Sequence, residues 1–122
     1  MATEFIRKTM ADVPTSAVPN TTNGNNDLYV VGANTDSVII GLLLTNKSGA
    51  SCVADVVIEV QSGQGEDVYL VKGAQIPVGS ALEIISGKVV VANTGSGTGD
   101  TLQVRCDTAS ALDATVSILE NT

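Results

Sequence analysis

The chain has 122 residues, with 13 Asp or Glu against 6 Lys or Arg, and a formal net charge of −7. This length suits one domain around one core, and the acidic balance argues against DNA or RNA as a partner. One Phe, two Tyr and no Trp leave the core to aliphatic side chains, of which the β-branched ones favour strands.

The N-terminal residues 3–13 mix apolar and charged side chains and predict an extended segment. This segment is either an edge strand of the chain's own sheet or an arm that packs on another subunit, with Phe5, Ile6 and Met10 as contact residues. Residues 14–27 contain two prolines and an Asn-rich stretch without apolar periodicity, which is typical of a polar loop. We therefore divide the chain into an arm and loop at 1–27 and a β-sandwich domain at 28–122.

The N-terminus also lacks the apolar core of a signal peptide. The longest apolar run, "SVIIGLLL", is too short to cross a bilayer. We expect a soluble protein made in the cytoplasm, with no membrane partner.

From Leu28 onward, short apolar runs alternate with turns rich in Gly, Asn and Asp, and every clear period is two. This pattern predicts an all-β fold, a single antiparallel β-sandwich of the jelly-roll or immunoglobulin-like kind with about eight short strands. The expected strands are 28–32, 37–45, 52–61, 67–72, 81–85, 88–92, 101–107 and 113–120. Inward positions in the clearest runs are Cys52, Ala54, Val56, Ile58 and Val60; Leu102, Val104 and Cys106; and Ala114, Val116 and Ile118. Outward positions are Asp55, Glu59, Gln103, Arg105, Asp107, Thr115 and Ser117.

The run "VVVANTGSGTGDTLQV", residues 89–104, contains a glycine-rich loop that could cradle a phosphate or turn a β-hairpin. A phosphate loop places Lys and Ser or Thr after its last glycine, whereas here Asp100 follows Gly99 and would repel an anion. The alternation after Asp100 is typical of a strand, so the hairpin is favoured. Whether residues 95–99 contact a partner stays open.

Other candidate sites are weak in this sequence. The chain has no His, which removes the commonest general base and metal ligand. Cys52 and Cys106 fit core thiols better than a disulfide or reactive groups. The loops "NGNND" (23–27) and "GQGED" (63–67) fit turns better than calcium sites. A glycosidase pair of Glu59 and Glu83 would lack the aromatic platform expected beside it. We expect no enzyme activity, no cofactor and no metal.

The last half of the chain carries a series of recognisable segments: "VYLVKGAQIPVGSALEII", "GKVVV" and "GDTLQVRCDTASALDATVSILE", within residues 67–120. This series resembles small virion structural proteins of tailed bacteriophages, especially marine ones, and "VIIGLLLTNKSG" is compatible with it. The resemblance implies structural residues only, so it supplies no catalytic residue. The sequence departs from it in the long "ANTGSGTGD" loop and in Cys106, where small polar residues are common.

The resemblance implies a non-enzymatic subunit of a tailed-phage virion. It would be a capsid decoration (cement) protein or a neck or tail accessory protein, forming a homo-oligomer in the particle and binding major capsid or neck and tail proteins. The alternative is a β-sandwich module that binds carbohydrates or receptors on the host surface. The absence of Trp disfavours that alternative.

Overall fold

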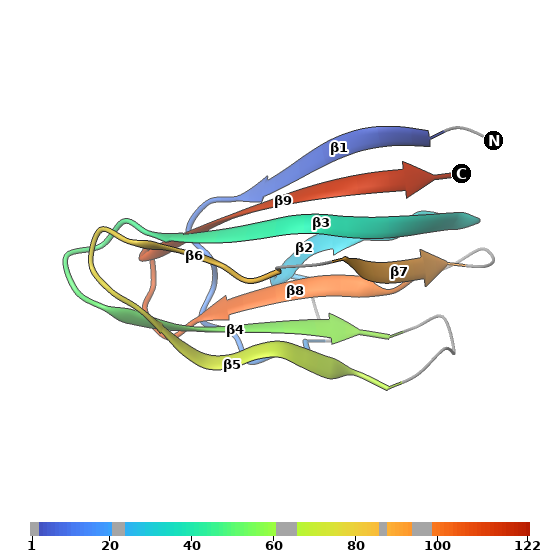
Figure 1. The fold of residues 1–122 in the computed structure, drawn as a ribbon. Coiled ribbons are helices and arrows are strands. Elements are labelled where there is room, and N and C mark those ends of the chain that lie inside the picture. The colour runs from blue at the N-terminus through green and yellow to red at the C-terminus, as the bar shows by residue number, and fades with distance from the viewer. Residues whose placement is uncertain (1–2, 21–23, 61–65, 86–87, 94–98) are drawn as a thin grey trace.

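The computed structural model describes residues 3–20, 24–60, 66–85, 88–93 and 99–122. These residues form two antiparallel sheets that pack face to face (Figure 1), which confirms the predicted β-sandwich. The strands are β1 (Thr3–Met10), β2 (Asp27–Val30), β3 (Thr35–Asn46), β4 (Cys52–Glu59), β5 (Val68–Ile76), β6 (Ala81–Glu83), β7 (Val89–Asn93), β8 (Thr101–Cys106) and β9 (Leu112–Asn121). Nothing in this described part is a helix capable of crossing a membrane.

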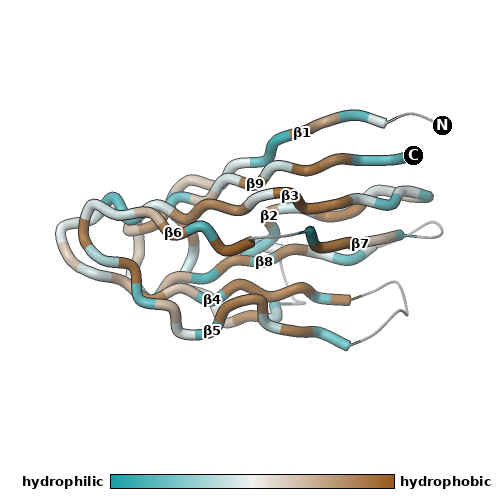
Figure 2. The backbone as a smooth tube through the Cα atoms, viewed as in Figure 1, coloured by the Kyte–Doolittle hydropathy of each residue, from teal (hydrophilic) through white to brown (hydrophobic). Residues whose placement is uncertain are grey.

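The first sheet has the order β1-β9-β3-β6, and β7 pairs with a second stretch of β3. The second sheet has the order β2-β8-β4-β5. Strand β3 is the longest strand and holds β9 along one edge and β6 and β7 along the other. Apolar segments lie along the strands of both layers, as Figure 2 shows.

The core lies between the sheets and follows the period-two positions expected from the sequence. Val104 on β8 and Val116 on β9 are fully buried, whereas Ser117 is exposed. Most of the largest fully buried side chains are aliphatic, and they include Ile39 and Leu44 of β3. Burying one such side chain contributes about 1.5–3 kcal/mol, so these aliphatic residues supply most of the hydrophobic stabilisation of the sandwich.

Strand β5 is longer than expected. The sequence predicts its end at residue 72, where "KGAQIPVGS" resembles a turn, but the strand continues to Ile76. Gly73 has a φ of +70°, and the pairing between β4 and β5 shifts register between Ala54 and Val56. Asp55 accepts a hydrogen bond from the backbone N–H of Gly73. The glycine therefore makes a β-bulge inside the strand instead of ending it.

The outer face of the second sheet is covered by residues 13–20, which we call the covering segment. The backbone carbonyl of Pro14 accepts from the N–H of Cys106 at 3.0 Å, and that of Val18 accepts from the hydroxyl of Tyr69 at 3.0 Å. Since Cys106 lies on β8 and Tyr69 on β5, the segment crosses the sheet. The expected polar loop is thus a packed layer.

Three outward assignments need correction. Gln103 was expected to face solvent but is fully buried, and Asp55 and Glu59 are also buried. Alternation predicted their side of the sheet correctly, because Gln103 alternates with the core residues Leu102 and Val104. The outer face of the second sheet was expected to be exposed to solvent, and this expectation was wrong.

Strand β1 pairs antiparallel with β9, from Thr3 opposite Asn121 to Met10 opposite Ala114. In the single chain, therefore, residues 3–10 form an edge strand of their own sheet, one of the two arrangements left open by the sequence. The division into an assembly arm at 1–27 and a sandwich at 28–122 stays a prediction.

Candidate interaction surface

The three predicted contact residues all lie on β1, but on two faces of it. Ile6 and Met10 are half-buried and pack against the core. Phe5, on the opposite face, leaves 76% of its surface exposed, the largest fraction among the exposed large apolar side chains. An apolar aromatic side chain in water is available for contact with another protein.

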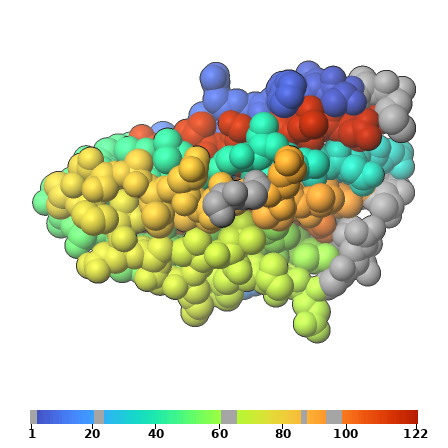
Figure 3. Space-filling view, viewed as in Figure 1, coloured from blue at the N-terminus to red at the C-terminus, as the bar shows by residue number. Residues whose placement is uncertain are grey.

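The outer edge of β1 is available as well. The strand stands at the end of its sheet, and no other strand of the described residues pairs with that edge. Figure 3 shows β1, in blue, along the upper rim of the molecule. An edge strand presents unpaired backbone N–H and C=O groups that can accept another strand.

The charged side chains of β1 form no ion pair with any of the described residues. These side chains, Glu4, Arg7 and Lys8, are exposed. Glu4 lies opposite Glu120 of β9, and like charges directly opposite each other are unfavourable. The strand therefore carries a carboxylate that faces a carboxylate on one side and open solvent on the other.

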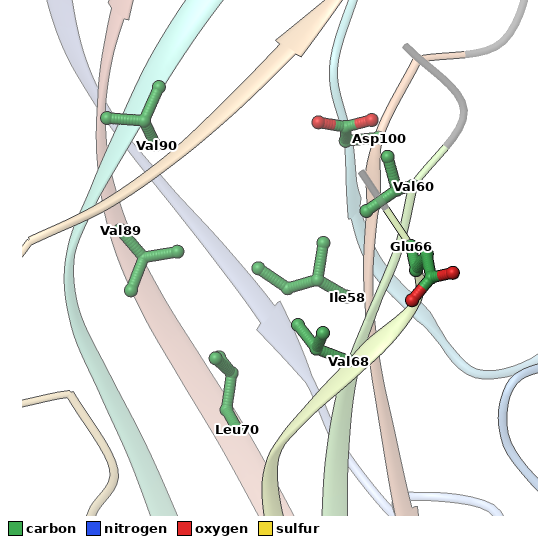
Figure 4. A pocket seen from close by; sticks show the side chains of 8 residues that line it. All are labelled: Ile58, Val60, Glu66, Val68, Leu70, Val89, Val90 and Asp100. Carbon is green, nitrogen blue, oxygen red and sulfur yellow. The ribbon is translucent and has the colours of Figure 1, made fainter. Parts of the chain in front are cut away.

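A shallow apolar hollow of about 360 Å³ opens between the sheets at the side opposite β1. Ile58 and Val68 line one wall and Val89 and Val90 the other, as Figure 4 shows, with Leu70 below them. Its carboxylates are those of Glu66 and Asp100. Among the described residues, the lining of the hollow offers apolar contact and no set of convergent polar groups.

Asp100 has a structural role that explains its place after the glycine-rich loop. Its carboxylate accepts from the backbone N–H of Ala92 at 3.1 Å, and its own N–H donates to the carbonyl of Ala92. A Cβ added to Gly99 would lie 2.6 Å from the carbonyl oxygen of Val31. Asp100 and Gly99 thus join the start of β8 to β7 and to the end of β2. The predicted hairpin is wrong, because β7 pairs with β3 in the first sheet while β8 pairs with β2 and β4 in the second, so the chain crosses between the sheets here. Residues 95–98 lie outside the described residues.

Cys52 and Cys106 are free thiols buried in the core, as expected. Cys106 lies on β8 opposite Ala54 of β4. Burial, together with a hydrogen bond to Cys106, raises the pKa of the Cys52 thiol to about 11. A thiol with this pKa is protonated at neutral pH and is a poor nucleophile.

The two carboxylates considered as a glycosidase pair lie in different sheets. Glu59 lies on β4 in the second sheet and Glu83 on β6 in the first. Among the described residues, no group of three or more carboxylate or thiol side chains comes together that could hold a metal ion. Part of each loop considered for calcium, residues 23 and 63–65, lies outside those residues.

One polar cluster was missed by the sequence analysis. The hydroxyl of Tyr29, on β2, shares a 2.7 Å hydrogen bond with the Oγ of Ser37 on β3 and donates to the carboxylate of Glu120 on β9. Burial and the neighbouring Glu120 raise the pKa of this phenol far above its usual value. The cluster ties the two sheets together. A tyrosine in an otherwise aliphatic strand is the one signal that could have indicated it.

Comparison with known proteins identifies the fold. No known family model and no curated protein matches the sequence. A chain in the structure of infectious bursal disease virus, Gx strain, matches 98% of this chain with a TM-score of 0.55 and 12% identity. A chain in the crystal structure of the T13 IBDV viral particle matches 97% with a TM-score of 0.51 and 13% identity. The chain shares its fold with these viral chains. It spans 33% and 30% of their lengths.

Proposed function

We propose that this protein is a non-enzymatic structural subunit of a virus particle. The observation that carries the proposal is the fold shared, over nearly the whole chain, with chains from virus structures. The resemblance of residues 67–120 to small virion proteins of tailed phages supports a more specific role. That role is a capsid decoration protein or a neck or tail accessory protein.

In this proposal the protein acts through protein–protein contacts, and β1 supplies them. Phe5 is the exposed apolar anchor, and Ile6 and Met10 fix the strand to the core from its other face. A strand that adds to a neighbour's sheet gains backbone hydrogen bonds and buries side chains. Repeated around a symmetric particle, such weak contacts act together and become strong.

Purified virions of the virus that would encode this protein test the proposal. We expect a protein band at this mass, identified by mass spectrometry of its peptides. A band comparable with that of the major capsid protein supports the decoration role, and a faint band supports the neck or tail. Absence of the peptides from purified virions contradicts the proposal.

A substitution tests the contact surface. Phe5→Ser should leave the fold intact, because the side chain is exposed, and should reduce incorporation of added protein into particles that lack it. Val90→Ser is the matched control, since Val90 is 66% exposed on β7, at the other side of the same sheet. Equal incorporation of both variants would exclude Phe5 as an anchor. Binding of the free protein to host cells, abolished by soluble sugar, would favour the carbohydrate-binding alternative.

A further inference from the structure

We propose that β1 pairs antiparallel with the β1 of a second copy of this chain, about a twofold axis that passes beside Ile6. The inference rests on the proposed function because it uses the same strand, and it names the strand's partner. It also predicts which residues face each other across the axis.

The first step is the geometry of the edge. The outer edge of β1 runs over Thr3–Met10 and no strand of the described residues pairs with it. Ile6 and Met10 lie on the core side of the strand, so Phe5 and Arg7 lie on the solvent side, because successive side chains alternate. Two copies joined at this edge would form one continuous sheet with both cores on the same side.

The second step is symmetry. Two antiparallel strands related by a twofold axis have that axis perpendicular to the sheet, so that each side chain keeps its face. The axis must then pass between one residue and the same residue of the partner. The possible registers differ only in which residue takes this central place.

The third step is charge. Registers centred on Glu4, Arg7 or Lys8 place that charged side chain opposite its own copy, which is unfavourable. A register centred on Phe5 overlaps over fewer residues and leaves Glu4 opposite an isoleucine. Registers centred nearer the ends of β1 overlap over only a few residues.

The register centred on Ile6 places a complementary group opposite each charged side chain of β1. It places Glu4 opposite the partner's Lys8, and by symmetry Lys8 opposite the partner's Glu4. It places Phe5 opposite the partner's Arg7, where a guanidinium can stack on the aromatic ring. Ile6 faces the partner's Ile6 on the core side.

This pairing offsets the repulsion between Glu4 and Glu120 described above. In the single chain Glu4 has Glu120 opposite it on β9 and, among the described residues, no ion-pair partner. In the proposed dimer a lysine lies on its other side. All three unpaired charges of β1 thereby gain a complementary group at one interface.

Charge reversal tests the register. Sedimentation velocity at low ionic strength would compare the natural protein, Glu4→Lys, Lys8→Glu and the double variant. Each single reversal sets like charges opposite each other on both sides of the axis, so we expect a dimer Kd about tenfold higher, equivalent to about 1.4 kcal/mol. The double variant restores opposite charges and should return to within about twofold of the natural Kd.

Two control variants carry the same charge changes away from β1. Glu83→Lys and Lys88→Glu are at exposed residues near the other side of the first sheet, and they should leave the dimer Kd unchanged. Circular dichroism should show the same strand content in every variant, because the substituted side chains are exposed.

The outcomes separate this inference from the proposed function. A natural protein that stays monomeric at the highest soluble concentration, or a double variant as weak as the single ones, overturns the inference even where the protein is found in virions. A dimer with the expected charge pattern, together with absence from purified virions, upholds the pairing and removes the virion role.

Discussion

At the scale of single residues, Gln103 shows how a buried amide holds a layer in place. Its Oε1 accepts from the backbone N–H of Asn20 at 2.9 Å, and its Nε2 donates to the carbonyl of Asn20 at 2.7 Å and to the carboxylate of Asp27 at 2.8 Å. These bonds fasten the end of the covering segment to the middle of β8. Removing the amide leaves half-buried polar groups of Asn20 and Asp27 without this partner.

We therefore expect Gln103→Ala to lower the free energy of unfolding by about 1–2 kcal/mol, since polar groups that lose a hydrogen bond in a partly buried site cost part of their desolvation. Urea denaturation at pH 7 would measure the change. Gln75→Ala is the matched control, because Gln75 is exposed on β5, and surface substitutions change stability by only about 0.5 kcal/mol. Similar values for the two variants would show that the covering segment does not depend on Gln103.

At the scale of elements, exposed carboxylates connect strands at the end of the sandwich away from the chain termini. Asp107 accepts from the backbone N–H of Val53 at 2.9 Å and so joins the end of β8 to β4. Asp113 binds the Nζ of Lys47 at 2.8 Å and accepts from the N–H of Asp12 at 3.0 Å, which joins β9, β3 and the segment after β1. The hydrogen bond from Val53 lowers the pKa of Asp107, and Lys47 lowers that of Asp113.

A lowered pKa in the folded state means that the unfolded chain binds the proton more tightly. The stabilisation is present above the unfolded value, about 3.9 for Asp, and is lost as the pH falls through the lower folded value. Asp107→Asn keeps an oxygen that can accept from Val53 but removes the ionisation. The difference in unfolding free energy between the natural protein and this variant should be larger at pH 6 than at pH 3.

Urea denaturation across pH 3 to pH 7 would measure this difference. Asp36→Asn, at an exposed carboxylate on β3, is the control for the loss of one negative charge from an acidic protein. A difference for Asp107→Asn that stays constant with pH would show that the bond to Val53 does not depend on ionisation.

The sequence predicted the apolar faces of the strands better than the exposure of their polar faces or the positions of their ends. Val104 and Val116 were placed in the core correctly, because alternation identifies the apolar side of a strand. The exposure of Gln103 was predicted wrongly, since alternation does not indicate whether another segment covers the polar face of a strand. The end of β5 was misplaced because a glycine such as Gly73 is expected both in a turn and in a β-bulge, so the sequence does not distinguish the two. The role of Phe5, Ile6 and Met10 could not be decided from the sequence, because a strand that pairs within the chain and one that pairs with another chain have the same residue pattern.

At the scale of the whole molecule, the two core thiols report on global unfolding. Cys52 and Cys106 are 1% and 0% exposed, on neighbouring strands at the centre of the second sheet. An alkylating reagent can reach them only when the sheets separate, and the raised pKa of Cys52, about 11, slows its reaction further. Their modification should therefore follow the rate at which the whole domain opens.

We expect mass spectrometry to find no adduct after iodoacetamide treatment of the native protein at pH 8, and adducts at both cysteines after the same treatment in urea. Rapid modification of the native protein would show that the core opens locally at this sheet. Failure to modify the unfolded protein would instead reveal a disulfide.

The antiparallel pairing of the first and last strands sets Thr3 beside Asn121, so that the two ends of the chain lie at the same end of the sandwich (Figure 1). A force that pulls these ends apart acts along the direction of the hydrogen bonds between β1 and β9. It loads the residue pairs one after another, beginning at Thr3, instead of all together. Strand β1 is thus the element that tension detaches first, one residue pair at a time. The seven strands β2 to β8 stay hydrogen-bonded within their sheets during this step.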